Sequence, residues 1–180
     1  MRTLELGKHR QARIWIGELP GLACSSIKTL THTITAERES QNGLRLAAIE
    51  VFAHVGPRSM YGLLGGHWKP HANTQLNIQV EISAANERLF TNSLALNDEV
   101  RVGLPIEYGN AVLTGVKAAK IELAALTAGE LSIDCAAHGA IGSCEAVYKH
   151  LATTLVKLFN LTNSEPSNEE LMNLFPPKFN

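Results

Sequence analysis

The segment from residue 103 to residue 119 constrains the fold most strongly, because it joins a helix-start signal to an unbroken apolar stripe. Pro105 suits the first helical position, where a missing backbone N–H leaves no bond unmade. Glu107 follows in the first turn, where the helix dipole favours an anion. The segment therefore predicts an amphipathic helix over 105–119 that buries one face. The residues of that face recur at helical spacing: Leu104, Tyr108, Ala111, Val112, Gly115, Val116 and Ala119.

Strand patterns occur on both sides of this helix. The clearest is 76–82, where every second residue is apolar and the residues between are polar. This alternation is typical of a sheet with one face on a helical layer. The same reasoning predicts strands over 12–16, 44–55 and 130–137. In the last of these, one face is expected to hold Leu131, Ile133, Cys135 and Ala137, and the other Ser132, Asp134 and Ala136.

Local signals complete the N-terminal part. Residues 22–30 have apolar positions on one side and favour a short helix, whereas the threonine-rich segment 29–35 favours a strand because β-branched residues prefer extended backbone. Gln41-Asn42-Gly43 contains Asn-Gly, the preferred pair for a tight hairpin turn. We therefore expect strands 29–35 and 44–55 to pair as a hairpin. Residues 88–102 are expected to hold a short strand or irregular structure.

A second helix is predicted from about Ser143 to residue 159, with Ser143 as the N-cap and Glu145 in the first turn. We expect residues 1–160 to form one domain, with N-terminal strands over 1–55. Residues 161–180 then form a polar tail. Ser167 and Glu170 have the capping-box spacing, which introduces a short amphipathic segment.

Residues 56–74 are rich in glycine, proline, histidine and aromatic residues, and predict a long loop. Aromatic side chains in such loops pack at interfaces or stack on bases, so we expect this loop to contact a partner. Its candidate binding residues are Tyr61, His67, Trp68, Lys69 and His71.

Composition excludes several classes of protein. The net charge of −1 implies no strongly basic face, which disfavours nonspecific binding to nucleic acid. The three cysteines lack CxxC spacing and their number is odd, so we expect a reducing, cytoplasmic setting without a disulfide framework. No long apolar run predicts a membrane span, and the first residues lack the apolar core of a signal peptide.

The region 70–159 resembles domain IV of elongation factor G, both in its order of strand, loop, helix, strand and helix and in two short motifs. The first motif is Pro, one residue, Glu-Tyr, then Ala-Val and Gly, carried here by Pro105, Glu107, Tyr108, Ala111, Val112 and Gly115. The second is a histidine followed by a serine and then an alanine before an aromatic residue, placed here on His138, Ser143, Ala146 and Tyr148. The family's aspartate before the serine is replaced by Gly142.

The resemblance implies an α+β fold, a two-layer α/β sandwich in which helices cover one face of a mixed sheet. In that family the βαβ connection is left-handed, unlike the usual connection. Translation is the associated process, because domain IV of the factor reaches the ribosomal decoding site. A phosphate-binding GxxxxGK[ST] loop is absent from the sequence, so the chain is not itself a GTPase.

Histidines give the alternative chemistry. His67 and His71 are four residues apart, and with His54 and His138 they are the weak candidates for a metal site. Pro70 disfavours the helical turn that would bring the first two together. Ser143, Cys144 and His138 contain a nucleophile and a base, although Ser143 is explained more simply as a helix cap.

The sequence therefore predicts a non-enzymatic, cytoplasmic binding protein without a cofactor, resembling a free-standing elongation factor G domain IV. Its expected partner is RNA, the ribosome or another protein. One alternative is a small histidine-containing enzyme of the lyase or hydrolase type. The other is a module that forms a homodimer or larger assembly.

Overall fold

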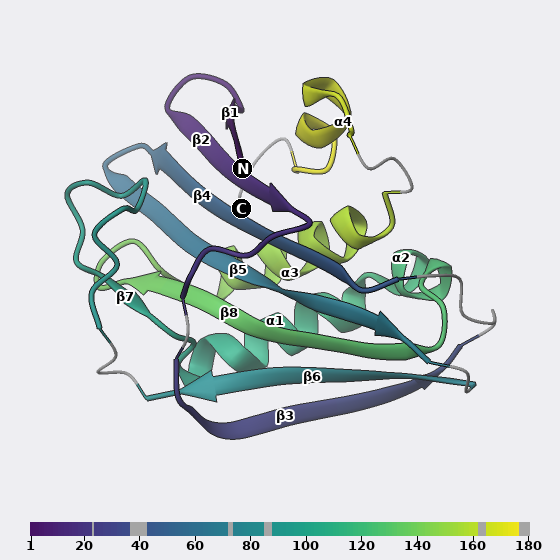
Figure 1. Ribbon diagram of the computed structural model, residues 1–180. Helices are drawn as coiled ribbons and strands as arrows, with labels where there is room; N and C mark the ends of the chain where they lie inside the picture. The colour runs from purple at the N-terminus through teal and green to yellow at the C-terminus, as the bar shows by residue number, and fades with distance from the viewer. Residues whose placement is uncertain (23, 37–42, 72–73, 85–87, 162–164, 177–180) are drawn as a thin grey trace.

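The computed structural model describes residues 1–22, 24–36, 43–71, 74–84, 88–161 and 165–176. Within these residues the chain forms a mixed eight-stranded sheet and four helices, an α+β fold (Figure 1). The strands are β1 (Arg2–Glu5), β2 (Arg10–Ile16), β3 (Ser26–Thr35), β4 (Arg45–Val55), β5 (Arg58–Pro70), β6 (Gln75–Ser83), β7 (Val100–Val102) and β8 (Gly129–Gly139). The helices are α1 (Ile106–Ala118), α2 (Lys120–Ala125), α3 (Glu145–Phe159) and α4 (Asn168–Met172).

The strands lie in the order β1-β2-β4-β5-β8-β6-β3, and β7 pairs with β8 outside this path. β8 lies between β5, to which it is antiparallel, and β6, to which it is parallel. β6 and β8 are joined through β7, α1 and α2. Because β2 lies near one edge of the sheet and β3 forms the other, the chain between them has to cross the sheet, and its described residues 17–22, 24 and 25 lie on the side away from α1 and α3 (Figure 1).

Helices α1 and α3 pack against each other and lie behind the sheet in Figure 1. α1 contacts β6 and β3, whereas α3 contacts β5 and β4. Their apolar faces meet every second residue of the strands in one large core cluster, to which α2 and α4 also contribute through Leu123 and Leu171. Burial of these apolar side chains is the main stabilising contribution to the fold.

The helix predicted over 105–119 is confirmed as α1, and its predicted stripe is buried apart from the half-buried Tyr108. Pro105 is the N-cap, one position before the predicted one. Gly115 lies where the two helices approach each other closely, because a Cβ there would lie 2.3 Å from the carbonyl oxygen of Lys149 on α3. A glycine at this position therefore sets the distance between α1 and α3.

The predicted loop over 56–74 is wrong, because most of it is the thirteen-residue strand β5 in the middle of the sheet. The glycines that suggested a loop have a packing reason instead. A Cβ on Gly66 would lie 2.0 Å from the carbonyl oxygen of Ser132, and one on Gly62 would lie 2.7 Å from the Leu151 side chain. These glycines let neighbouring backbone and α3 approach the strand closely.

The predicted hairpin between strands 29–35 and 44–55 is also wrong. β3 pairs with β6, and β4 pairs with β2 and β5. Residues 41 and 42 of the predicted turn lie outside the described residues. The predicted helix over 22–30 is replaced from Ser26 onward by β3, since pairing with β6 along its length outweighs a weak helical pattern. The strands at 12–16, 76–82 and 130–137 are confirmed.

The C-terminal tail packs on the body of the domain. The capping box of Ser167 and Glu170 is confirmed and starts α4. Leu171 and Phe175 are buried in the large core cluster. The guanidinium of Arg10 donates to the carbonyl oxygen of Pro176 at 2.7 Å and lies 5.9 Å from the centre of the Phe175 ring. The tail is therefore held both by apolar burial and by a strand residue.

Candidate functional site

The face of the sheet opposite α1 and α3, called here the open face, is only partly covered. Residues 17–22, 24 and 25 cross it, and residues 88–99 lie over one part of it. Beneath them is a second, smaller apolar cluster of buried residues: Trp15, Leu22, Ala48, Tyr61, Leu63, Ala95, Val100, Val102, Cys135 and Ala137. The rest of this face, on β3, β6 and the adjacent parts of β5 and β8, presents polar side chains. An uncovered region of this kind is the natural candidate for contact with another molecule.

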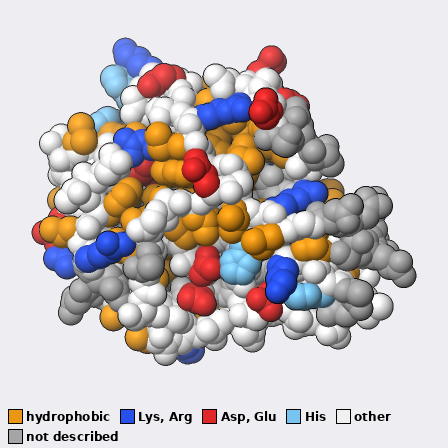
Figure 2. Space-filling view, viewed as in Figure 1, with side chains coloured by type: hydrophobic (Ala, Val, Ile, Leu, Met, Phe, Trp, Pro, Cys, Tyr) orange, Lys and Arg blue, Asp and Glu red, His pale blue; other side chains and the backbone are white. Residues whose placement is uncertain are grey.

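We call the accessible polar group on this region the open-face patch: His67, Lys69, Gln79, Glu81 and Asp134. These residues come from β5, β6 and β8, and the strand register brings His67 and Gln79 to the two sides of the same β8 residue, Ser132. Figure 2 shows this face, with hydrophobic side chains gathered across its middle and histidine and acidic side chains beside them. The surface is therefore amphipathic.

A β-bulge creates the central contact of the open-face patch. Gly65 pairs with Cys135 and Gly66 pairs with Ile133, so Asp134 is the additional residue on β8. The Asp134 carboxylate lies 3.1 Å from His67 Nδ1, and both side chains are 27% exposed. The bulge also reverses the alternation of β8. Cys135 and Ala137 lie in the open-face cluster and Ala136 in the large core, the opposite of the predicted faces.

Burial dominates the electrostatics of the open-face patch. It raises the pKa of Asp134 above the ordinary value, and the neighbouring His67 opposes that shift. The pKa of Glu81 is also raised, first by burial and then by the charge of Asp134. Asp134 Oδ1 is buried without a hydrogen-bond partner among the described residues. The Asp134 carboxylate therefore orients the His67 ring through its Nδ1 atom.

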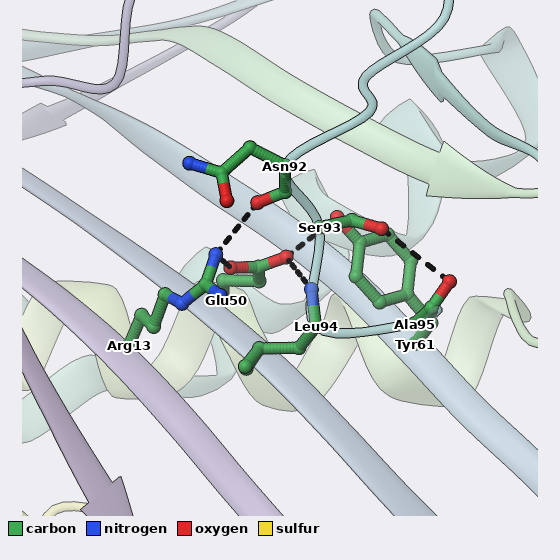
Figure 3. Close-up of polar contacts among 7 residues, drawn as sticks. All are labelled: Arg13, Glu50, Tyr61, Asn92, Ser93, Leu94 and Ala95. Atoms are coloured by element: carbon green, nitrogen blue, oxygen red, sulfur yellow. Dashed lines mark hydrogen bonds and ion pairs between the residues drawn. The ribbon is translucent and has the colours of Figure 1, made fainter. Parts of the chain in front are cut away.

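A buried carboxylate fixes the segment 92–94, which covers part of the open face (Figure 3). Glu50 on β4 is 0% exposed and accepts hydrogen bonds from the Tyr61 hydroxyl at 3.0 Å and from the Leu94 backbone N–H at 2.8 Å. Arg13 on β2 donates to Glu50 at 3.2 Å and to the Asn92 carbonyl oxygen at 2.6 Å. Residues 92–94 are thereby tied to two strands of the sheet.

The pKa values of the buried Glu50 and Tyr61 are both shifted. Burial raises the pKa of Glu50, while the Leu94 N–H, the charge of Arg13 and the Tyr61 hydroxyl act in the opposite direction. Burial raises the pKa of Tyr61 as well. Glu50 bonds Leu94 directly and reaches the Asn92 carbonyl oxygen through Arg13, so this buried group positions residues 92–94 on the sheet.

A second carboxylate holds the end of this segment. Asp98 accepts hydrogen bonds from the backbone N–H groups of Ile141 and Gly142, the latter at 2.8 Å. Ser143 does not cap α3 as predicted. Its hydroxyl accepts from the Gly139 N–H and donates to the Tyr61 carbonyl oxygen, both at 2.9 Å, and Cys144 occupies the N-cap position. Ser143 therefore joins β5 to the turn after β8 and is not placed as a nucleophile.

Two predicted contact residues are inaccessible. Tyr61 is fully buried and bonded to Glu50, and Trp68 is 2% exposed within the large core. The Arg45 guanidinium lies 5.3 Å from the centre of the Trp68 ring. Trp68 and Tyr61 therefore cannot stack on a base or a sugar, and that part of the prediction is wrong. Of the remaining predicted residues, Lys69 is exposed and His67 and His71 are half-buried.

The four candidate histidines do not form one site. His54 and His67 lie near opposite ends of the β4–β5 pair, since His54 pairs with Ser59 and His67 with Leu46. At a rise of about 3.3 Å per residue, the eight-residue separation along β5 is about 26 Å. His138 is buried, with Nδ1 3.0 Å from the Gly103 carbonyl oxygen. Across the described residues, no cluster of three or more histidine, cysteine or carboxylate side chains is placed to hold a metal ion.

Sequence patterns missed Glu50 and Asp134. Glu50 lies in a strand whose alternation correctly marks it as facing away from the helices, and nothing local signals that residues 92–94 bury it. Asp134 meets His67 only because β5 and β8 pair with a bulge. Both contacts join segments far apart in sequence.

Comparisons of the chain with protein-family models, with curated proteins and with solved structures find no match. None of the helices within the described ranges has the length and apolar character needed to cross a membrane.

Proposed function

We propose that this protein is a non-enzymatic binding protein, similar to a free-standing elongation factor G domain IV, that binds a protein partner through its open-face patch. The observation that carries the proposal is the uneven cover of the sheet. One face is filled by α1 and α3, whereas the open face is covered over one part only and carries an amphipathic, accessible region beside the bulge at Asp134. A polar patch that lies beside exposed hydrophobic side chains on a rigid sheet suits protein recognition.

The arrangement of the elements supports the resemblance. β6 and β8 are parallel neighbours joined by a connection that contains α1, and α1 and α3 share one face of the sheet. We infer that the domain is a two-layer α/β sandwich and that this connection is left-handed. An experimentally determined structure tests the hand directly, and a right-handed connection would remove the basis for the resemblance.

Charge favours a protein over RNA as the partner. Several arginine side chains already donate hydrogen bonds to carbonyl or carboxylate oxygens of other residues in the chain. They are Arg2, Arg10, Arg13, Arg45, Arg88 and Arg101, bonded to Pro166, Pro176, Glu50, Phe159, Gly21 and Glu99 in turn. The open-face patch also contains Glu81 and Asp134, which repel phosphate. RNA binding by this face would require a basic surface.

A second candidate function rests on the contact between His67 and Asp134. A carboxylate that holds one nitrogen of a histidine is a common way to orient a general base, which favours the alternative of a small enzyme. The two candidates separate with His67→Gln. If the protein is an enzyme, His67→Gln abolishes turnover and leaves the affinity for the partner unchanged. If it is a binding protein, Glu81→Lys lowers the affinity for the partner more than His67→Gln does.

Photo-crosslinking tests the favoured function. A photoreactive phenylalanine analogue at Gln79 should give one adduct in cells that express the protein, and the same analogue at the exposed Lys149 on α3 should not. The partner identified from that adduct should bind the purified protein, and Glu81→Lys should weaken its binding about tenfold. Binding of structured RNA at low salt that Glu81→Lys strengthens would instead point to the nucleic-acid alternative.

Two further properties belong to the same proposal. No disulfide joins the cysteines within the described residues, and a reducing, cytoplasmic location is part of the proposal. Light scattering measures whether the protein is a monomer or a homodimer. A dimer that buries the open-face patch would make the second copy the partner.

A further inference from the structure

The two edges of the sheet are protected very differently. β1 forms one edge and has four residues, two of which, Arg2 and Glu5, are charged. β3 forms the other edge, has ten residues without proline, and carries Lys28 as its only lysine, arginine or carboxylate. Among the described residues β3 pairs only with β6. Proteins normally shorten or charge such an edge, because its outer backbone groups can bond to another strand.

A groove lies beside β3 on the helix side of the sheet. It has a volume of about 440 Å³ and is bounded by His32 and Ile34 on β3, by Lys117 at the end of α1 and by Lys120 and Leu123 on α2. A strand added to β3 would lie about 4.8 Å beyond it. Every second side chain of that strand would point toward the helices and so enter this groove. The exposed edge and the groove therefore form a single surface.

The chemistry of the groove is apolar and basic. Ile34 and Leu123 supply apolar walls. Ile121, two residues before Leu123 on α2, has a side chain that is 85% exposed. Lys117 and Lys120 are exposed, and neither forms an ion pair within the part of the chain that the structure describes. Among the described residues that line the groove there is no carboxylate. Its walls are therefore complementary to a chain that combines apolar and acidic side chains.

We propose that β3 and this groove bind an extended segment of another protein, which joins the sheet as a further antiparallel or parallel strand. The backbone of β3 bonds to the segment, and the groove selects an apolar residue flanked by acidic ones on the side that faces α2. This surface is separate from the open-face patch, and the proposal goes beyond the function proposed above.

A second copy of the chain fits this edge less well. Two-fold pairing of β3 with β3 would bring Lys28, Lys117 and Lys120 of both copies to one seam. Like charges at a shared seam oppose association. Charge complementarity therefore favours an acidic segment of a different protein.

Fluorescence anisotropy with a designed peptide tests the proposal. The probe is a fluorescein-labelled seven-residue peptide with threonine at odd positions and glutamate, leucine and glutamate at even positions. The comparison peptide has lysine in place of both glutamates. We expect the acidic peptide to bind at least about tenfold more tightly, because two ion pairs are gained and two repulsions avoided.

Matched variants locate the binding. Lys117→Glu combined with Lys120→Glu should weaken binding of the acidic peptide about tenfold and favour the lysine peptide. Lys8→Glu combined with Lys149→Glu makes the same charge change at exposed positions in the β1–β2 turn and on α3, and should alter binding less than about twofold. Thermal unfolding verifies that each variant is folded. In NMR spectra of the 15N-labelled wild-type protein, the backbone amide signals of β3 should shift when the acidic peptide is added.

Three results would overturn the proposal. They are equal affinity for the two peptides, no binding up to about 1 mM, and amide shifts confined to residues outside β3 and α2. A stable dimer with β3 amides protected from exchange would assign the edge to a second copy instead. None of these results bears on crosslinking through the open-face patch, so the two proposals fail independently.

Discussion

The two faces of the sheet are built from alternate residues of the same strands, yet they are held in different ways. On the helix side, apolar side chains of β6, β8 and β4 meet α1 and α3 in one continuous core. On the open face, a smaller apolar cluster is covered by segments without regular structure, and buried polar groups hold these segments in place. Apolar packing suffices where a helix supplies a long complementary face. An irregular segment needs bonds to its backbone.

This difference predicts the largest loss of stability on the helix side. Leu151→Ala removes a fully buried side chain of α3 and leaves a cavity between that helix and β5. We expect the free energy of unfolding to fall by about 3–4 kcal/mol, measured by urea denaturation. The exposed Lys149→Ala on the same helix is the control and should change stability little. A loss smaller than that caused by Glu50→Ala would contradict the comparison.

On the open face, Glu50→Ala should cost about 2–3 kcal/mol, because it leaves Arg13 and the Leu94 N–H without their buried acceptor. Hydrogen exchange should show faster opening of residues 92–94 than of α1. Glu50→Gln keeps an oxygen acceptor and should cost less. Equal exchange changes in α1 and residues 92–94 would show that the segment is held by something other than Glu50.

The raised pKa of Glu50 predicts the pH dependence of this face. The folded state holds its proton to higher pH than the unfolded state does, so stability is greatest below the ordinary pKa of the carboxyl. Stability then falls as pH rises from that ordinary value through the folded-state pKa, with a slope of at most about 1.4 kcal/mol per pH unit from this one group. Urea titrations across this interval should give a flatter curve for Glu50→Gln than for the wild type. Identical curves would contradict the raised pKa.

The smallest effect is expected at the tail. Ser167→Ala removes the acceptor that caps the first turn of α4 and should cost about 1 kcal/mol. Because Leu171 and Phe175 remain buried, the loss should appear as faster exchange in α4 with little change elsewhere. Ser167→Asp is the control, since it retains a side-chain acceptor. Exposure of Leu171 in the alanine variant would show that capping, and not apolar burial, docks the tail.

Elements with a strong internal period were predictable from the sequence. Both long helices and strands β2 and β6 follow from spacing, because burial of one face imposes that spacing. The position of β8 follows in the same way, although its bulge reverses the predicted faces of residues 135–137. Strand β5 was not predictable in this way. Its glycines are explained by the close approach of α3 and β8, which come from elsewhere in the chain. The partner of β3 was not either, because an Asn-Gly turn signal says nothing about which strand lies alongside.

The candidate site was less predictable than the fold. His67 and Lys69 were identified from composition and are accessible, whereas Tyr61 and Trp68 were assigned to contact and are buried. An aromatic residue beside glycine has the same local pattern in a loop and in a central strand. The contact of Asp134 with His67 depends on the bulge in β8, which the sequence pattern does not indicate.

The position of β8 has a consequence for how the chain reaches its native state. Without this strand, β1, β2, β4 and β5 form one antiparallel group and β6 and β3 another, with no pairing between them. Within the sheet the two groups are joined through residues 129–139, which are made after most of the chain. Such late, long-range closure gives a high contact order, so we expect slow folding that is limited by the docking of this single strand.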